Sequence, residues 1–229
     1  MKACVLAIVV LSTSPAIAHP RHCDEESDVV GYQRCSRFGT GWSGERTLAW
    51  ELGATMLRMP FDAVDRTVDA GHVIAPAGTA AVSAIRLRNI YNLARHFYIA
   101  TELSLGKLTG APELVIEPAA RDIMSLDGGT HGTLFDGMLA AGTRASLGPV
   151  AVGSELAFGP RVLIYSKADL PGVLFGQGGV ALEARVHASV WLSPHWSAGV
   201  MLATSVLERD DVSITCGLGL HAFPFDGGR

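Results

Sequence analysis

Glu183, His187 and Ser189 are the residues of this sequence whose types and spacing come closest to a catalytic group. An acid, a base and a hydroxyl are the side chains that acyl-transfer catalysis combines. Residues two apart on an extended strand lie about 6.6 Å apart along it, too far for a direct hydrogen bond between His187 and Ser189. The sequence also contains no recognisable oxyanion-hole motif. We therefore interpret the trio as part of a buried polar network and expect that the protein is not an enzyme.

Two groups of residues could supply metal ligands. The first consists of Asp122, Asp127, His131 and Asp136, and the second of His19, His22, Cys23 and Cys35. The first group lies in a Pro-, Gly- and Asp-rich stretch that is typical of a solvated loop, and the spacing of the second matches no standard zinc pattern. The glycine-rich segments lack the residues that cradle phosphates. We predict no metal site and no cofactor.

The N-terminus predicts export. Lys2 is followed by an apolar segment and by a small-residue cleavage site that ends at Ala18, so residues 1–18 are interpreted as a signal peptide. Residues 19–46 are polar and lack periodicity, which predicts an N-terminal extension. Apart from the signal peptide, no run approaches the roughly 20 apolar residues of a membrane-spanning helix.

Export to an oxidising compartment bears on the cysteines. Cys23 and Cys35 could close a disulfide within the N-terminal extension. Cys216 shares its parity with Ile214 and Leu218, which predicts that it lies on an apolar face as a small hydrophobe.

The composition limits the classes of function. A length of 229 residues suits one domain, and the net charge of −4 gives no case for nucleic-acid binding. Charged residues make up only 17% of the chain and the mean hydropathy is +0.29, which is apolar for a soluble protein.

The elements that would position the polar trio are long strands. In residues 179–194 one parity is almost wholly apolar, and the other carries Glu183, Arg185, His187 and Ser189. Successive side chains of a strand point to opposite faces, so this pattern predicts a ribbon with two unlike faces. Seven further segments show strand-like patterns: residues 47–56, 80–91, 97–108, 137–147, 150–165 (with a bulge or kink at 159–160), 196–207 and 212–223.

The connections between these eight segments favour one topology. They alternate between long or medium and short, except for the last, which is also short. An antiparallel meander places alternate connections at opposite ends, and trimmed turns at one end with longer loops at the other are typical of a transmembrane β-barrel. The fold class predicted is all-β: an eight-stranded antiparallel up-and-down barrel over residues 47–225, with a C-terminal tail at 226–229.

The charges on the polar parities indicate which face lies inside. Arginine and glutamate occur there in equal numbers and lysine does not, which suits a confined interior where each charge needs a partner. The predicted interior network consists of Glu51, Arg86, Arg88, Glu102, Arg144, Glu155, Glu183, Arg185 and His187.

With its signal peptide, strand count, loop alternation and Glu/Arg parity, the chain resembles the small eight-stranded outer-membrane barrels of Gram-negative bacteria, of the OmpA-like and OmpX-like kind. Tyr91, Phe97 and Trp196 lie beside short turns on apolar parities, as the aromatics of a membrane interface would.

The resemblance implies an outer-membrane protein of the cell envelope, in contact with lipid and expected to be a monomer. Its role would be structural, or an interaction with an extracellular ligand or protein through the loops at 57–79 and 109–136. One alternative is a secreted or periplasmic soluble barrel that binds a small apolar ligand against Leu182, Val186 and Val190. The other is a lipid-modifying enzyme.

Overall fold

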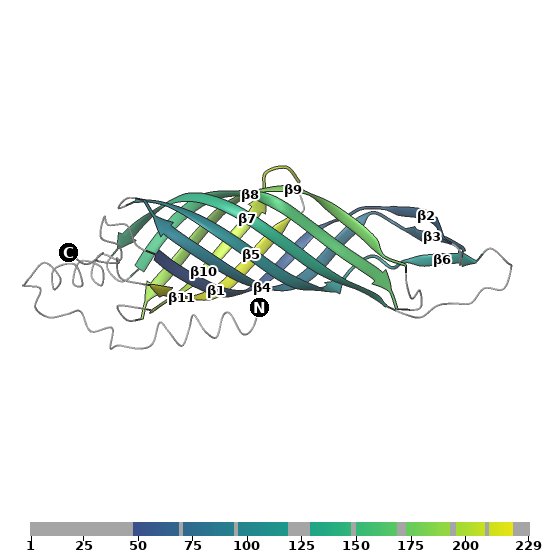
Figure 1. Ribbon diagram of the computed structural model, residues 1–229, viewed down its shortest axis with the longest axis horizontal. Coiled ribbons are helices and arrows are strands. Elements are labelled where there is room, and N and C mark those ends of the chain that lie inside the picture. The colour runs from purple at the N-terminus through teal and green to yellow at the C-terminus, as the bar shows by residue number, and fades with distance from the viewer. Residues whose placement is uncertain are drawn as a thin grey trace, which may run out of the picture.

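The computed structural model describes residues 48–68, 71–93, 96–118, 129–147, 150–168, 173–192, 196–208 and 211–221. Eight strands form a closed barrel in the order β1-β11-β10-β9-β8-β7-β5-β4, and every neighbouring pair is antiparallel (Figure 1). Each barrel strand pairs with the barrel strands before and after it in sequence, and β1 pairs with β11 to close the ring. The predicted eight-stranded up-and-down barrel is confirmed.

The barrel strands are β1 (Leu48–Phe61), β4 (Gly78–Asn92), β5 (Phe97–Gly110), β7 (Thr130–Leu147), β8 (Val150–Lys167), β9 (Phe175–Trp191), β10 (Trp196–Ser205) and β11 (Val212–His221). The connections at 93–96, 148–149 and 192–195 lie at what we call the turn end, and the longer ones at the loop end. Among the described residues, no helix is long and apolar enough to cross a membrane.

Burial alternates along β1, β4, β5, β7 and β8, and less regularly along β9, β10 and β11, because one parity points into the tube and the other points out. In β4 and β5 every second residue is buried over almost the whole strand. Several strands run for 14 to 18 residues, which is more than the roughly 9–11 needed to cross a bilayer at a tilt. The barrel is therefore longer than the sequence predicted, and its extra length lies at the loop end.

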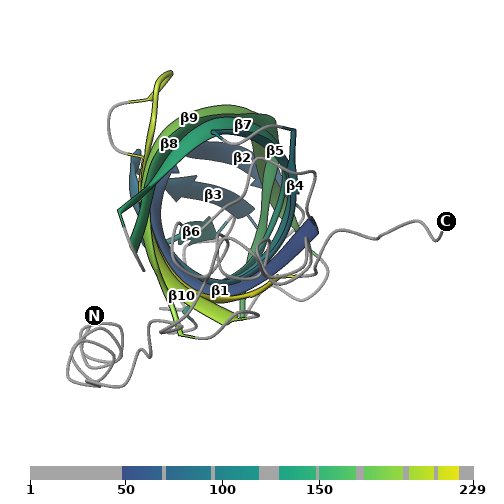
Figure 2. The ribbon, with the colours of Figure 1, turned by 90° about the vertical axis from the view of Figure 1, so that its left-hand side faces the viewer.

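Both stretches predicted as long loops contain β structure. Residues 57–79 hold the end of β1, the hairpin of β2 (Val64–Val68) and β3 (Gly71–Ala75), and the start of β4. Residues 109–136 hold β6 (Val115–Pro118) and the beginning of β7. Strands β2, β3 and β6 form a separate three-stranded sheet beyond the loop end of the barrel (Figures 1 and 2).

Strand β8 keeps its register through the predicted bulge. Its pairing with β7 lapses only opposite Gly159 and Pro160 and resumes in the same register, and its pairing with β9 is continuous. The lapse follows from proline, which has no N–H to donate. A Cβ at Gly159 would lie 1.9 Å from the Gly137 carbonyl oxygen, so the chains approach there more closely than any side chain permits. The expectation of a bulge was wrong.

Several predictions fall outside the described residues: the signal peptide at 1–18, the N-terminal extension at 19–46, the Cys23–Cys35 disulfide, and the tail at 226–229. Cys216 lies on the outward parity of β11 and takes part in a disulfide, so it is not the unbonded hydrophobe that its neighbours suggested.

Candidate functional site

The nine predicted residues of the interior network come from six strands and occupy the inward parity of each. Arg86, Arg88, Glu102, Arg144, Glu155, Glu183 and Arg185 are all buried, and Glu51 and His187 are half-buried. Seven of these nine residues lie on the neighbouring pairs β4/β5 and β8/β9. Because strand register fixes the height of each side chain in the tube, the pairs Arg88↔Glu102 and Glu155↔Arg185 lie directly opposite each other.

Arg185 is the centre of the network. Its two terminal nitrogens lie 2.8 and 2.9 Å from the two carboxylate oxygens of Glu102, in the bidentate arrangement that favours arginine over lysine. Nη1 also donates to Glu155 at 3.1 Å, and Nε donates to Glu183 at 2.7 Å. One guanidinium therefore links strands β5, β8 and β9.

A second group surrounds Arg88, nearer the turn end. Arg88 contacts Glu155 and donates to Glu51 at 3.3 Å. The Tyr98 hydroxyl donates to Glu155 at 2.5 Å and lies 2.8 Å from His187 Nε2. The Arg144 guanidinium lies 4.3 Å from the centroid of the Tyr98 ring and donates to Asn92.

A third group, around Arg161, was missed by the sequence analysis. Arg161 donates to Asp136 from both Nε and Nη2, to Asp211 from Nη1 at 2.5 Å, and to Glu183. Asp136 had been assigned to a loop, because Gly132 and Gly137 hide the alternation of β7. Arg161 follows the Gly159-Pro160 step, where we had expected β8 to bend. The parity of Arg161 relative to Glu155 was the signal that could have identified it.

The interior charges are equal in number but include residue types that were not predicted. The cations are Arg86, Arg88, Arg144, Arg161, Arg185 and Lys167, and the carboxylates are Glu51, Glu102, Asp136, Glu155, Glu183 and Asp211. The prediction that lysine is absent from the interior was wrong, because Lys167 lies on the inward parity of β8 and donates to the Leu114 carbonyl at 2.7 Å. Six cations against six anions leave the described interior without surplus charge if all of them are ionised.

The suspected catalytic trio does not assemble. His187 contacts Tyr98, and Glu183 is bound by Arg185 and Arg161. Of the other candidate metal ligands, Asp122 and Asp127 lie outside the described residues, whereas Asp136 is held by Arg161. Among the described residues no group of His, Cys, Asp and Glu side chains is arranged to hold a metal ion.

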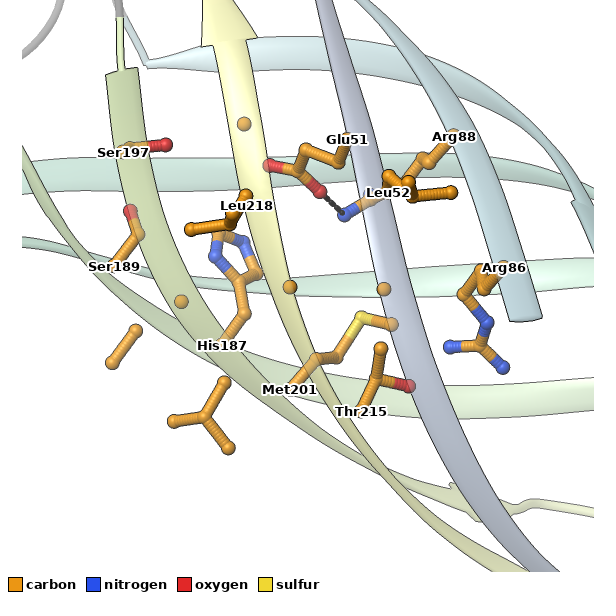
Figure 3. A pocket seen from close by; sticks show the side chains of 16 residues that line it. Glu51, Leu52, Arg86, Arg88, His187, Ser189, Ser197, Met201, Thr215 and Leu218 are labelled. Atoms are coloured by element: carbon orange, nitrogen blue, oxygen red, sulfur yellow. Dashed lines mark hydrogen bonds and ion pairs between the residues drawn. The ribbon is translucent and has the colours of Figure 1, made fainter. Parts of the chain in front are cut away.

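The interior is filled rather than open. A cavity of about 50 Å³ lies beside the inward-facing Gly53, Gly199, Gly217 and Gly219, and Arg86 and His187 also line it (Figure 3). The space exists because these glycines carry no side chain. It has room for a few water molecules, and it is far smaller than an aqueous pore.

The interior changes character towards the loop end. There an apolar cluster fills the tube, and its members come from the barrel strands and from the small sheet. It includes Leu57, Met59, Phe61, Val64, Val73, Val82, Leu108, Leu114, Leu134, Leu163, Tyr165 and Phe175. The small sheet therefore closes the loop end of the barrel with a core like that of a soluble protein.

The outward face of the barrel is apolar on every strand. One exposed aliphatic residue from each strand illustrates this: Leu52, Ile85, Leu103, Leu139, Leu156, Val186, Leu202 and Leu218, each about half or more exposed, from 49% to 67%. Among the described barrel-strand residues of this parity, the only Asp, Glu, Lys or Arg residues are Arg58 and Lys107, towards the loop end.

The three predicted interface aromatics all face outward beside the turn end. Tyr91 is 38% exposed, Trp196 47% and Phe97 58%. Trp50, on the outward parity of β1, is also exposed at that end.

Comparisons with known proteins give a likeness of fold. No family model and no curated protein matches the chain. The solved structures include Ail, the attachment invasion locus protein of Yersinia pestis, in complex with the heparin analogue sucrose octasulfate, at 13% identity and a TM-score of 0.48 over 78% of this chain and 99% of that one. Neisserial surface protein A follows at 14% identity, with a TM-score of 0.45 over 76% and 96% of the two chains. The N-terminal β-barrel domain of Pseudomonas aeruginosa OprF has 11% identity and a TM-score of 0.41 over 78% and 100%.

Proposed function

We propose that this protein is an outer-membrane β-barrel protein, with the turn end towards the periplasm and the loop end outside the cell. The observation that carries the proposal is the outward face, where large apolar side chains are exposed on all eight barrel strands. Soluble monomers rarely expose contiguous apolar patches larger than a few hundred Å². Hydrocarbon is the solvent that makes such a surface favourable.

The interior supports the same placement. Buried arginines and glutamates are costly unless they are paired, and here they form a connected network within the closed tube. The soluble-barrel alternative required an apolar cavity lined by Leu182, Val186 and Val190, but these residues lie on the outward parity and Val186 is 56% exposed. The soluble-barrel alternative therefore lacks the interior apolar cavity in which its ligand would bind.

The proposed role is structural, or an interaction with an extracellular ligand or protein through the loop end, and it is not enzymatic. Support comes from the three-stranded sheet, which makes the loop end a compact folded surface on an apolar core. A surface that is already ordered loses less conformational entropy when a partner binds than flexible loops would.

Membrane fractionation followed by heat-modifiability on a gel tests the placement. We expect the protein in the outer-membrane fraction, with a folded band that migrates differently from the boiled one. Recovery of folded protein in solution without detergent would contradict the proposal.

Planar-bilayer recording tests the filled interior separately. Because ion pairs and the apolar core occupy the tube, we expect no large stable pores. Large, stable conductance steps from the purified protein would refute a filled interior without refuting the membrane placement.

A further inference from the structure

The barrel wall has a gap at the loop end, because two strands stop early. β10 ends at Ser205, opposite Glu183, and β11 begins at Val212, opposite Arg58. Strand β9 continues past this level to Phe175, and β1 continues to Phe61. The β10–β11 connection, yellow in Figure 1, turns back near the middle of the barrel, and Figure 2 shows that hairpin projecting away from the wall.

A single side chain bridges the gap above the hairpin. Gln177 on β9 accepts a hydrogen bond from the Asp62 amide at 3.2 Å and donates one to the Pro60 carbonyl at 2.9 Å. Backbone pairing between β9 and β1 is thus replaced by one amide side chain at this height. Below the bridge the two strand edges are separated by an opening.

A cavity of about 90 Å³ occupies this opening. Its lining includes the inward-facing Ala181, Arg161 and Asp211 as well as the outward-facing Val180 and Leu207, so it extends through the thickness of the wall. Val180 is 69% exposed and Leu207 63%, which makes the outer rim apolar. On the inner side the cavity ends at the ion pairs of Arg161. It is therefore a pocket in the wall and not a passage through the barrel.

The charges around this pocket are predominantly negative. Asp62, Glu208 and Asp211 line it, and the only basic residue among the lining is Arg161. Arg161 is already engaged by Asp136 and Glu183 on its other side. Asp136 does not itself line the pocket, but its Oδ1 is buried without a hydrogen-bond partner among the described residues, which leaves negative charge next to Arg161. The carboxylates that line the pocket therefore favour a cationic group, and the apolar side chains at its outer rim favour a hydrocarbon group.

The geometry points to a binding site in the barrel wall for a small amphiphile with a single ammonium head group, whose head enters between β9 and β1 and whose alkyl chain lies outside against Val180 and Leu207. The site goes beyond the proposed function, although the position of the alkyl chain rests on the membrane placement proposed above. A metal ion fits less well, since no ligand cluster for one exists among the described residues. An ammonium donates hydrogen bonds to carboxylates, and its alkyl chain is accommodated by the rim.

Asp211 gives the site an expected pH dependence. It lies in the β10–β11 connection, and burial raises its pKa to about 6 although Arg161 opposes the shift. The other charged groups around it are Glu183 on β9, Asp136 on β7 and Glu208 in the same connection, and all three also raise the pKa of Asp211. An ammonium interacts best with the ionised carboxylate, so its affinity should rise as the pH rises through about 6.

Calorimetric titration of nonylamine into the protein in phosphatidylcholine nanodiscs tests the site, with empty nanodiscs as the blank. Gly179→Leu places a side chain in the pocket, where a Cβ has no neighbour within 4 Å, and should abolish binding. Gly176→Leu on the same strand is equally unobstructed but lies outside the pocket, and should bind like the parent. Asp211→Asn should weaken binding about tenfold at pH 7.5 and remove the pH dependence, whereas the exposed Glu113→Gln should change neither.

Heat-modifiability of every variant is measured in parallel, so a failure of the membrane placement is distinguishable from a failure of the site. Equal nonylamine uptake by parent, Gly179→Leu and Asp211→Asn would mean that the amine only partitions into the bilayer, and would overturn the proposal. Saturable binding of nonanoate as tight as that of nonylamine would overturn the assigned charge.

Discussion

The middle of this barrel and its loop end share the same eight-stranded wall but have opposite interiors. On the inward parity of β1, Glu51, Gly53 and Thr55 face the charged network, whereas Leu57, Met59 and Phe61 belong to the apolar core. On β4, which is antiparallel to β1, the apolar residues come first: Ala80 and Val82 belong to the apolar core, and Arg86 and Arg88 to the charged network. The change therefore occurs at one height around the tube and not at one place in the sequence.

The outward face changes in the same region. Around the charged interior it is aliphatic, and Arg58 and Lys107 appear on it only towards the loop end. Under the proposed membrane placement, hydrocarbon surrounds the middle and water surrounds the loop end. A strand between lipid and a polar interior must put its polar groups inside, whereas a strand surrounded by water can bury apolar groups as a soluble barrel does.

Removal of the central arginine should give the largest effect. Arg185→Leu leaves Glu102, Glu155 and Glu183 without their shared cation, so we expect a loss of about 3–5 kcal/mol, measured as unfolding by urea in lipid vesicles. Arg58→Leu removes the same charge from the outward face and should change stability by less than about 0.5 kcal/mol. Similar losses in the free energy of unfolding of the two variants would show that the interior ion pairs do not stabilise the middle of the barrel.

The apolar core should respond locally. Phe61→Ala truncates a side chain that is 1% exposed, which costs about 3–5 kcal/mol where the surroundings cannot collapse. We expect faster proteolytic cleavage at the loop end, with little change in the temperature at which the folded gel band disappears. Phe135→Ala, on the outward face, is the control for cleavage. A large drop in that temperature for Phe61→Ala would mean that the two regions unfold as one unit.

The Gln177 bridge should have a smaller effect that is confined to the gap. Gln177→Ala removes two hydrogen bonds, each worth about 1 kcal/mol. Hydrogen exchange of the Asp62 amide should quicken, while amides of the β5–β7 ladder keep their rates and act as the internal reference. An unchanged rate at Asp62 would show that the bridge does not hold the wall together.

The smallest expected effect is on pH dependence. The pKa of Asp211 in the folded protein is about 6, above the value of about 3.9 in an unfolded chain, so the folded state binds this proton more tightly. The contribution of Asp211 to stability is therefore greatest below about pH 4 and is lost as the pH rises to about 6. Hydrogen exchange at the loop end should slow between pH 7 and pH 5 after correction for intrinsic rates, and Asp211→Asn should abolish that change. Faster corrected exchange on acidification would contradict this sign.

Much of the middle of the barrel could be predicted from the sequence. Strict alternation through Glu183, Arg185 and His187 identified β9, and the connection lengths identified the meander. Asp136 and Arg161 were missed because glycine and proline interrupt the local pattern on which such predictions rest. The β2–β3 hairpin was missed because its alternation is short, contains Gly71, and lies between segments that carry Pro60, Pro76 and Gly78.

By itself the sequence determined which side chains share a face, since alternation along an extended chain needs no knowledge of any other segment. Only the tertiary structure decided which charges meet: Arg185 contacts Glu102 across 83 residues of sequence, and Arg161 contacts Asp211 across 50. Those contacts depend on ring closure and on the register of strands that are far apart in the chain. The gap at the loop end is likewise a tertiary feature. The short strands β10 and β11 leave an opening only because ring closure places them between the longer strands β9 and β1.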